Sequence, residues 1–275
     1  MAPDERWLAV RVEPSADRQS VIDALFAAGS QGIQEAGNAI VTHFPPGTDA
    51  TSIERAIHEV DPDSMVSVEL APAADWSEWR ASVGEHRLGR VTITPPWIEG
   101  SDDSIRIVID PAMAFGTGEH ATTRGVIRLM QKLERVPEKV ADLGSGSAVL
   151  AVCAAKLGAR NVAAVELDPD AIGNAEENIE VNNVTDAVHV IQGDASLLMP
   201  LIAPVDLILA NIISSVLIEL LPVMAESLSP GGYAILSGIL AEEREMMLGV
   251  LLAGGWVTVD EDLEENWWSV MITRQ

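Results

Sequence analysis

The sequence contains little cysteine and few basic residues. Its 275 residues include a single cysteine, Cys153, which excludes both a disulfide framework and a cluster of thiolate metal ligands. Lys and Arg number 17 against 42 Asp and Glu, which gives a formal net charge of -25. Such a surface repels a nucleic-acid backbone, so we expect no direct nucleic-acid binding and a basic protein as the easier partner. The acidity would equally keep a cytosolic protein soluble, and both interpretations stay open at this point.

Several catalytic and targeting patterns are missing as well. The five histidines show neither an i,i+4 pair nor metal-ligand spacing, so we expect no metal site. The chain has no Gly-x-x-x-x-Gly-Lys phosphate loop and no Gly-x-Ser-x-Gly nucleophile elbow. Its first residues lack the basic start and apolar core of a signal peptide, and we expect a cytoplasmic protein. The most apolar stretch, Val205 to Ala225, contains two acidic residues and is predicted to be a buried strand followed by a helix, not a membrane span.

Residues 1–70 follow the order strand, helix, strand, strand, helix, strand. The predicted strands are 7–12, 33–35, 39–44 and 65–70, and the predicted helices are 17–28 and 53–60. Gly37-Asn38 is a hairpin-turn signal between the second and third strands. This order matches a ferredoxin-like domain. Because these residues hold no cluster of reactive groups, we expect the domain to be a docking module and not a catalytic one.

Residues 71–103 are predicted to be a connector, because they contain Pro72, Pro95 and Pro96. They also hold two tryptophans at i,i+3 spacing, Trp76 and Trp79, on a predicted short helix. These rings either pack the seam between two domains or face a substrate.

From residue 104 onward, strands and helices alternate. Strands are predicted at 140–143, 162–166, 188–191, 205–210 and 233–237, and helices at 149–157, 169–181, 212–228 and 241–252. This alternation predicts an α/β fold, in which a mostly parallel, Rossmann-like sheet is covered on both faces. The last two strands, 257–263 and 267–273, follow each other without a helix, so the final strand is predicted to run antiparallel.

A glycine-rich turn lies where the first strand of this sheet should lead into a helix. The stretch Asp142 to Leu150 contains Gly144 and Gly146, and Val149 stands where a dinucleotide fingerprint needs a third glycine. The short form Asp-x-Gly-x-Gly favours a nucleoside cofactor without a pyrophosphate, although a plain strand-to-helix turn would read the same way.

Acidic residues follow the next two strands. Glu166 ends the second strand, 24 residues after Asp142, and is placed to accept hydrogen bonds from ribose hydroxyls. Asp168, followed by Pro169, is typical of a helix N-cap. Asp194 follows the third strand and would accept from an adenine amino group.

Two further segments suggest chemistry on an amine. Asn211, at the end of a strand, either caps the next helix or offers its amide oxygen to a reacting amine. The string Asp110 to Thr123 combines glycines with hydroxyl and imidazole groups, and we expect it to fold over a ligand. Within it, Phe115 either faces a cationic ligand through a cation–π contact or belongs to the core. His120 either accepts the amine proton or braces the loop.

These motifs together resemble the class I S-adenosylmethionine-dependent methyltransferases, and within them the bacterial lysine methyltransferases of ribosomal protein L-eleven (PrmA type). That family carries Asp-Pro-x-x-Ala-Phe-Gly-Thr-Gly-x-His-x-Thr-Thr, matched here by residues 110–123. It also carries Asp-x-Gly-x-Gly-Ser-Gly, matched by 142–147 with Ala148 in place of the usual glycine. Its Asp-Ile-Asp-Pro, Ala-Asn-Ile and Ser-Gly-Ile-Leu correspond to 166–169, 210–212 and 237–240, with Glu166 as the departure.

The resemblance implies a seven-stranded methyltransferase sheet in residues 104–275 and a substrate-recognition domain in residues 1–70. It implies S-adenosylmethionine as cofactor and a ribosomal protein, modified on lysine side chains and the N-terminal amine, as substrate. With the residues argued above, the predicted cofactor contacts are Phe115, Thr122, Gly144, Gly146, Glu166, Asp194 and Asn211, and Asn211 is also the predicted catalytic residue.

Other functions remain open on the sequence. A mitochondrial relative with the same Phe-Gly-Thr-Gly loop methylates a flavoprotein subunit, so the loop indicates the catalytic class and not the target. The alternatives are methylation of such an electron-transfer flavoprotein, of a small molecule or of RNA, or cofactor binding without activity. The sequence does not fix the oligomeric state, and a monomer is compatible with it.

Overall fold

The computed structural model describes residues 7–15, 18–30, 33–36, 39–45, 47–70, 84–98, 104–110, 118 and 120–274. The chain divides into two compact units, Met1–Ser82 and Val83–Gln275. The first has a hydrophobic core of its own, and the second has one core on each face of its large sheet. None of the helices in the described ranges is long and apolar enough to cross a membrane.

The first unit is a four-stranded antiparallel sheet with the strand order β2-β3-β1-β4 and two helices. Its elements are β1 (Leu8–Glu13), α1 (Arg18–Ala27), β2 (Ile33–Ala36), β3 (Ala39–Phe44), α2 (Ala50–Val60) and β4 (Met65–Leu70). Alternate residues of β1, Val10 and Val12, are buried against Leu25 of α1 and Ile57 of α2. The predicted ferredoxin-like arrangement is therefore confirmed. The predicted turn at Gly37-Asn38 lies outside the described residues.

The second unit is built on a seven-stranded sheet with the order β10-β9-β8-β11-β12-β14-β13. Its strands are β8 (Lys139–Leu143), β9 (Asn161–Glu166), β10 (Val188–Gln192), β11 (Val205–Asn211), β12 (Leu228–Leu240), β13 (Trp256–Glu264) and β14 (Trp267–Arg274). The first five strands in that order run parallel, and β14 runs antiparallel to both of its neighbours. The predicted sheet and its antiparallel last strand are confirmed.

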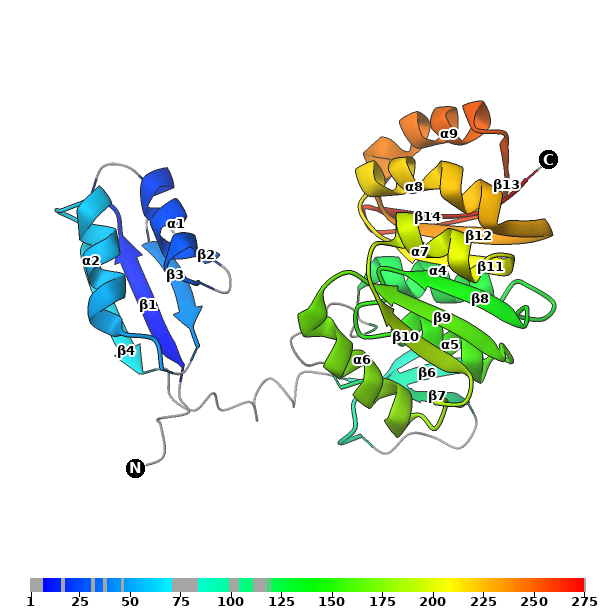
Figure 1. The fold of residues 1–275 in the computed structure, drawn as a ribbon, viewed down its shortest axis with the longest axis horizontal. Helices are drawn as coiled ribbons and strands as arrows, with labels where there is room; N and C mark the ends of the chain where they lie inside the picture. Colours follow the sequence, from blue (N-terminus) through cyan, green and yellow to red (C-terminus); the bar gives the residue numbers. More distant parts are fainter. Residues whose placement is uncertain are drawn as a thin grey trace. The chain divides into compact units, whose positions relative to one another are not determined.

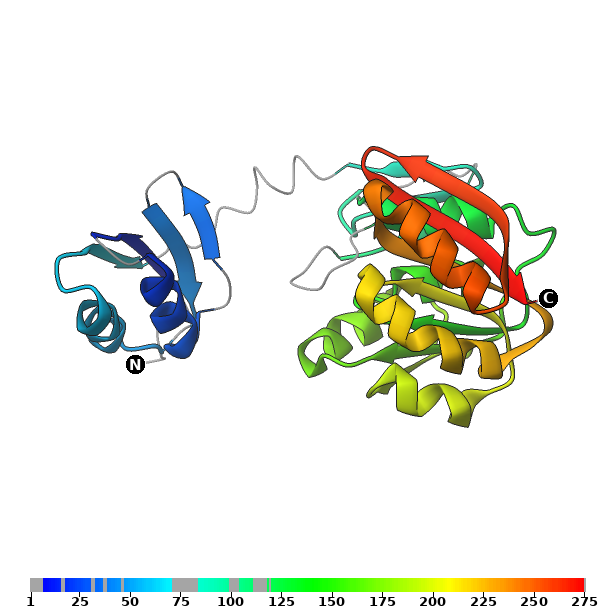
Figure 2. The ribbon, with the colours of Figure 1, turned by 90° about the horizontal axis from the view of Figure 1, so that it is seen from above.

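Helices cover both faces of this sheet (Figures 1 and 2). One face carries α4 (Ala121–Met130), α5 (Val149–Lys156) and α6 (Pro169–Val181); the other carries α7 (Ala195–Ile202), α8 (Ser214–Ser227) and α9 (Arg244–Ala253), which follows the short 3-10 helix η1 (Ala241–Glu243). Successive side chains of a strand point to opposite faces of the sheet, which explains both layers. In β8, Val140 belongs to the core beneath α4, α5 and α6, and Ala141 to the core beneath α7, α8 and α9. Each fully buried Val, Leu or Ile contributes about 1.5–3 kcal/mol. The strand-then-helix prediction for Val205 to Ala225 is confirmed by β11 and α8.

A smaller sheet of three strands completes the second unit. It consists of β5 (His86–Leu88), β6 (Val91–Thr94) and β7 (Ile105–Val108), with β6 in the middle. Every residue of β6 is buried, so this segment packs into the core. The stretch 71–103, which we predicted to be a connector, therefore contains two strands. Trp76 and Trp79 lie outside the described residues.

Candidate active site

The candidate site lies at the carboxyl ends of the parallel strands, where the direction of chain winding changes. From β8 the chain proceeds to β9 and β10 on one side, and it then returns to β11 on the other side of β8. Ligands of open α/β sheets bind at this switch point. The glycine turn follows β8, and Asn211 is the last residue of the adjacent strand β11.

The glycine turn is held by backbone hydrogen bonds to the neighbouring strand β9. The N–H groups of Gly144 and Ser145 both donate to the Val165 carbonyl, at 2.9 and 3.1 Å. Ala148 precedes α5 in a left-handed conformation, with φ 62°, and no side chain caps the helix there. A left-handed backbone costs a residue with a Cβ about 1–2 kcal/mol. This cost gives a physical reason why the resembled motif has glycine where this chain has Ala148.

Glu166 joins the glycine turn to the start of α6. Its Oε2 accepts from the Gly146 N–H at 2.7 Å, and its Oε1 accepts from the Asp168 N–H at 2.9 Å. A carboxylate has about four acceptor positions, so each oxygen keeps one for a ligand hydroxyl. Two predicted contacts, Gly146 and Glu166, are thus brought together. Asp168 is the N-cap of α6 and accepts from the Asp170 N–H, which confirms its predicted role as a cap.

Asp142 lies beneath the turn and is buried to 1% exposure. Its Oδ2 accepts from the Ala151 N–H at 2.9 Å, whereas among the described residues neither its Oδ1 nor the buried Ser145 Oγ has a hydrogen-bond partner. Burial raises the pKa of Asp142 from 3.8 to about 7, and the charge of Glu166 adds to that increase. Cys153 of α5 is also fully buried, and burial raises the pKa of its thiol to about 12.

Asp194 occupies the N-cap position of α7, a helix that the sequence did not reveal. Its carboxylate is exposed and accepts from the Ser196 backbone N–H and from Ser196 Oγ, at 2.8 and 2.7 Å. The hydrogen bond from Ser196 Oγ is the main reason why the pKa of Asp194 is lowered. The preceding Gly193 N–H donates to the Glu166 carbonyl at 2.8 Å, so the backbone here adjoins β9. The adenine contact of Asp194 stays a prediction.

The loop that we expected to close over a ligand leads into α4. Residues 111–117, including Phe115, lie outside the described residues. His120 is the N-cap of α4, and its Nδ1 accepts from the Thr122 N–H and lies 2.8 Å from Thr122 Oγ1. Its ring meets Trp267 edge-on, with centroids 4.9 Å apart. This geometry supports the bracing role for His120 over that of a proton acceptor.

The predicted contact Thr122 is buried in the first turn of α4, and its carbonyl accepts from Ser237 Oγ at 3.1 Å. Ser237 belongs to the Ser-Gly-Ile-Leu motif of β12. The next residue, Gly238, has φ 83°, and an added Cβ would lie 2.4 Å from the Ile212 carbonyl oxygen. Only glycine fits this close approach of β12 to the chain that leaves β11.

Asn211 does not cap α8. The N-cap of that helix is Ile213, which makes no side-chain cap bond, so this alternative for Asn211 is wrong. Two residues, Ile212 and Ile213, separate Asn211 from the first turn of the helix. Instead, Asn211 Nδ2 donates to Thr123 Oγ1 at 3.3 Å. This hydrogen bond uses Nδ2 and leaves Asn211 Oδ1 as an acceptor.

Two buried asparagines, Asn178 of α6 and Asn182 at the C-cap of that helix, link parts of the site, and the sequence reasoning missed them. Asn178 Oδ1 accepts from the Asp110 N–H at 2.9 Å, and its Nδ2 donates to the Ser147 carbonyl at 3.0 Å. Asn182 likewise binds the N–H and the carbonyl of Val108. The pair therefore links the strand that enters the loop to the glycine turn. Their i,i+4 spacing on one helix face was the available signal, because a buried amide is costly unless both ends are bonded.

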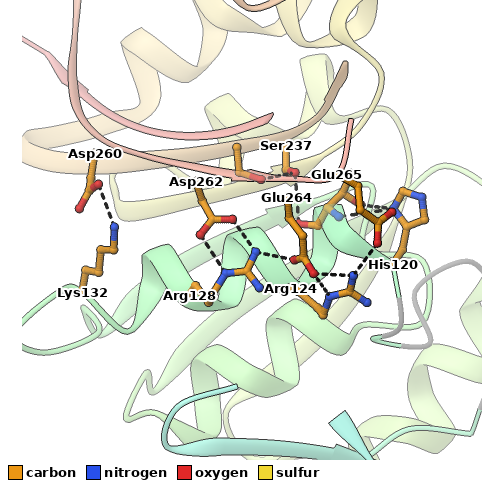
Figure 3. A network of polar contacts seen from close by, with 11 residues as sticks. His120, Arg124, Arg128, Lys132, Ser237, Asp260, Asp262, Glu264 and Glu265 are labelled. Atoms are coloured by element: carbon orange, nitrogen blue, oxygen red, sulfur yellow. Dashed lines mark hydrogen bonds and ion pairs between the residues drawn. The ribbon is translucent and has the colours of Figure 1, made fainter. Parts of the chain in front are cut away.

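An ion-pair ladder, also missed, fixes α4 on β13 (Figure 3). Arg124 and Arg128 lie on α4 and Lys132 lies two residues beyond its end, each four residues from the next, whereas Asp260, Asp262 and Glu264 are spaced two apart on β13. Arg128 binds Asp262 and Glu264 at 2.5 and 2.6 Å, Arg124 binds Glu264 at 2.7 Å, and Lys132 binds Asp260 at 2.9 Å. Four helical residues rise about 6.0 Å, and two strand residues rise about 6.6–6.8 Å. The helix and the strand therefore stay in step between Arg124 and Arg128, and Lys132, beyond the end of α4, adds a third ion pair.

The fold and this site define a Rossmann-like methyltransferase. The sequence model of the family described as ribosomal protein L11 methyltransferase (PrmA) matches residues 8–275, and the chain belongs to this family. A ribosomal protein L11 methyltransferase of Pelotomaculum thermopropionicum is 40% identical over 210 residues, which are 75% of this chain and 68% of that protein. One of Streptococcus pyogenes is 30% identical over 310 aligned residues, covering 98% of this chain and 96% of that protein.

A solved structure supports the same assignment. The crystal structure of a ribosomal protein L11 methylase from Lactobacillus delbrueckii subsp. bulgaricus is similar with a TM-score of 0.63 and 30% sequence identity. The similarity covers 70% of this chain and 98% of that one. The resemblance inferred from the motifs is thereby confirmed.

Proposed function

We propose that this protein transfers methyl groups from S-adenosylmethionine to lysine side chains and the N-terminal amine of ribosomal protein L11. The observation that carries the proposal is the meeting of the glycine turn, Glu166 and Asn211 at the switch point of the sheet. Membership of a family whose relatives are L11 methyltransferases supports this substrate. The alternatives, methylation of a flavoprotein, a small molecule or RNA, or binding without activity, are not favoured.

The residues around the turn fit the cofactor. Gly144 and Gly146 have no Cβ to keep a ligand away from the backbone, and the buried Asp142 Oδ1 and Ser145 Oγ lack partners in the described part of the chain. Glu166 would hold the ribose hydroxyls. When bound, S-adenosylmethionine supplies a methyl group on a sulfonium, and its thioether product is neutral. No acidic residue is therefore needed to protonate a leaving group.

The main demand on the protein is to present an uncharged amine. Lysine has a reference pKa of about 10.4, so removal of its proton at pH 7 costs roughly 4–5 kcal/mol. Burial of the amine disfavours the ammonium form and supplies part of this energy. Asn211 Oδ1 would accept a hydrogen bond from the amine and orient its lone pair. Holding the two reactants in line contributes the rest.

Residues 1–70 would recognise the substrate protein. They form a ferredoxin-like sheet with its own core. The chain's net charge of -25 suits a basic ribosomal protein, and we place the reaction in the cytoplasm, where ribosomal proteins are made.

The test combines cofactor binding with methyl transfer to purified L11. Glu166→Ala should weaken S-adenosylmethionine binding in calorimetry by ~1–3 kcal/mol, because charged hydrogen bonds are lost. The control is Glu176→Ala, which removes an exposed carboxylate of α6 and should bind S-adenosylmethionine as the wild type does. The wild type should transfer labelled methyl groups to L11. An unaltered dissociation constant in Glu166→Ala would refute the assignment of Glu166 to the ribose. If the wild type left L11 unlabelled, the proposal that L11 is the substrate would be refuted.

A further inference from the structure

The side chain of Asn211 is an amide with two chemically different ends. Its Nδ2 donates hydrogen bonds, and its Oδ1 accepts them. The structure fixes the first end, because Nδ2 donates to Thr123 Oγ1 at 3.3 Å. Half a turn about the last side-chain bond would exchange the ends and place a donor where the amine needs an acceptor. The bond to Thr123 therefore determines which end of the amide, Nδ2 or Oδ1, a substrate meets.

We propose that Thr123 is a positioning residue for methyl transfer. Its hydroxyl holds Asn211 Nδ2 and so directs Asn211 Oδ1 toward the incoming amine. The inference rests on the proposed role of Asn211, and it adds a residue to which neither the motifs nor the family comparison gave a role. Thr123 itself touches no reacting atom and acts through Asn211.

The surroundings of Thr123 suit this task. The residue has 0% exposure, so water does not compete for its hydroxyl. A buried hydroxyl is costly unless it is hydrogen-bonded, and the bond to Asn211 meets that need. The partners lie 88 residues apart, on α4 and β11, so the bond persists only where the helix and the sheet keep a fixed relative position.

The helix that carries Thr123 is anchored on both sides of it. Before Thr123, the Thr122 carbonyl accepts from Ser237 Oγ, which also lies 2.7 Å from Ser269 Oγ of β14. After it, Gly125 packs so closely that an added Cβ would lie 2.3 Å from Ser269 Oγ. The ion-pair ladder then holds the rest of α4 on β13 (Figure 3). The hydroxyl of Thr123 is thus presented from a helix that has little freedom to slide.

The matched variants are Thr123→Val, which keeps the shape but removes the hydroxyl, and Thr123→Ser, which keeps the hydroxyl. Thr123→Val should lower kcat on L11 by ~10²-fold, the effect expected for a misplaced group. Its dissociation constant for S-adenosylmethionine and its melting temperature should stay close to those of the wild type. Thr123→Ser should recover most of kcat. The control Thr92→Val removes a buried hydroxyl on β6 that is bonded to Ser104 Oγ. It should change neither kcat nor the dissociation constant for S-adenosylmethionine.

A second readout needs no turnover. The side-chain amide resonance of Asn211, assigned by its disappearance in Asn211→Ala, should shift in Thr123→Val and return in Thr123→Ser. Should Thr123→Val fold poorly, Thr123→Ala removes the hydroxyl with a smaller side chain and is compared in the same way. An unmoved resonance, or wild-type kcat without the hydroxyl, overturns the inference. Wild-type turnover in Asn211→Ala would instead refute the role of Asn211, which keeps the two failures distinguishable.

Discussion

Asp142 should impose a pH dependence on stability that is measurable without substrate or cofactor. The carboxyl is buried to 1% exposure, and burial raises its pKa from 3.8 to about 7. The unfolded chain therefore releases this proton near pH 4, whereas the folded protein keeps it until about pH 7. Between these values stability falls as the pH rises, because the unfolded state alone gains from ionisation. The difference between the two pKa values corresponds to about 4 kcal/mol.

Asp142→Asn removes this titration and keeps the side-chain oxygen that accepts from the Ala151 N–H. We expect the free energy of unfolding of the variant, minus that of the wild type, to increase between pH 4 and pH 8 by up to about 4 kcal/mol. Urea denaturation of both proteins at matched pH values measures this difference. Contributions from carboxylates that do not interact with Asp142 cancel in the subtraction, because they are common to both proteins.

Glu264→Gln serves as a control of opposite sign. The hydrogen bond from Arg124 is the main reason why the pKa of Glu264 is lowered. Its contribution to stability is therefore present above the unfolded pKa and is lost as the pH falls through the folded pKa. The free energy of unfolding of the wild type should exceed that of Glu264→Gln at neutral pH, and this difference should disappear in acid. A pH-independent difference between Asp142→Asn and the wild type would show that Asp142 has the same pKa in the folded and the unfolded chain, and our account of the buried turn would be wrong.

Four other perturbations address the anchoring of α4 and the role of the first unit. Arg128→Met should lower the free energy of unfolding by about 1.5–3 kcal/mol, because charged hydrogen bonds to two carboxylates are lost, whereas Lys132→Met on the exposed rung should cost less than about 1 kcal/mol. If urea denaturation gave equal losses in the free energy of unfolding for the two variants, the stabilising role of the ion-pair ladder would be contradicted. Gly125→Ala should lower melting temperature and methyl transfer together, because its Cβ would collide with Ser269 Oγ. Removal of residues 1–82 should preserve calorimetric S-adenosylmethionine binding and abolish methylation of L11; unchanged turnover would exclude a docking role.

Local signals in the sequence were sufficient for most elements of the second unit. Helix α6 begins at Pro169 as predicted, because Asp168 and Pro169 form an N-cap and N1 pair. The strand β6 was missed, since its four residues stand next to Pro95-Pro96 and resemble a linker. Helix α7 was missed because an eight-residue, almost wholly apolar segment with an internal proline, Pro200, shows little helical periodicity.

The candidate site was only partly predictable for a different reason. The glycine turn and Glu166 are close in sequence to the strands that position them, so their grouping follows from the parallel topology. The bond between Asn211 and Thr123 joins residues 88 positions apart, and that between Arg128 and Asp262 joins residues 134 apart. Such partners are set by how helices pack on the sheet. For the ion-pair ladder, the sequence signal was the four-residue spacing of Arg124 and Arg128.

The central claim is tested most directly by mass spectrometry of ribosomal protein L11 from otherwise identical cells with and without the gene for this protein. We predict that L11 carries methyl groups on lysine side chains and on its N-terminal amine only in cells that make the protein, and that an Asn211→Ala copy does not restore them. An identical L11 mass in both cell lines would contradict the account.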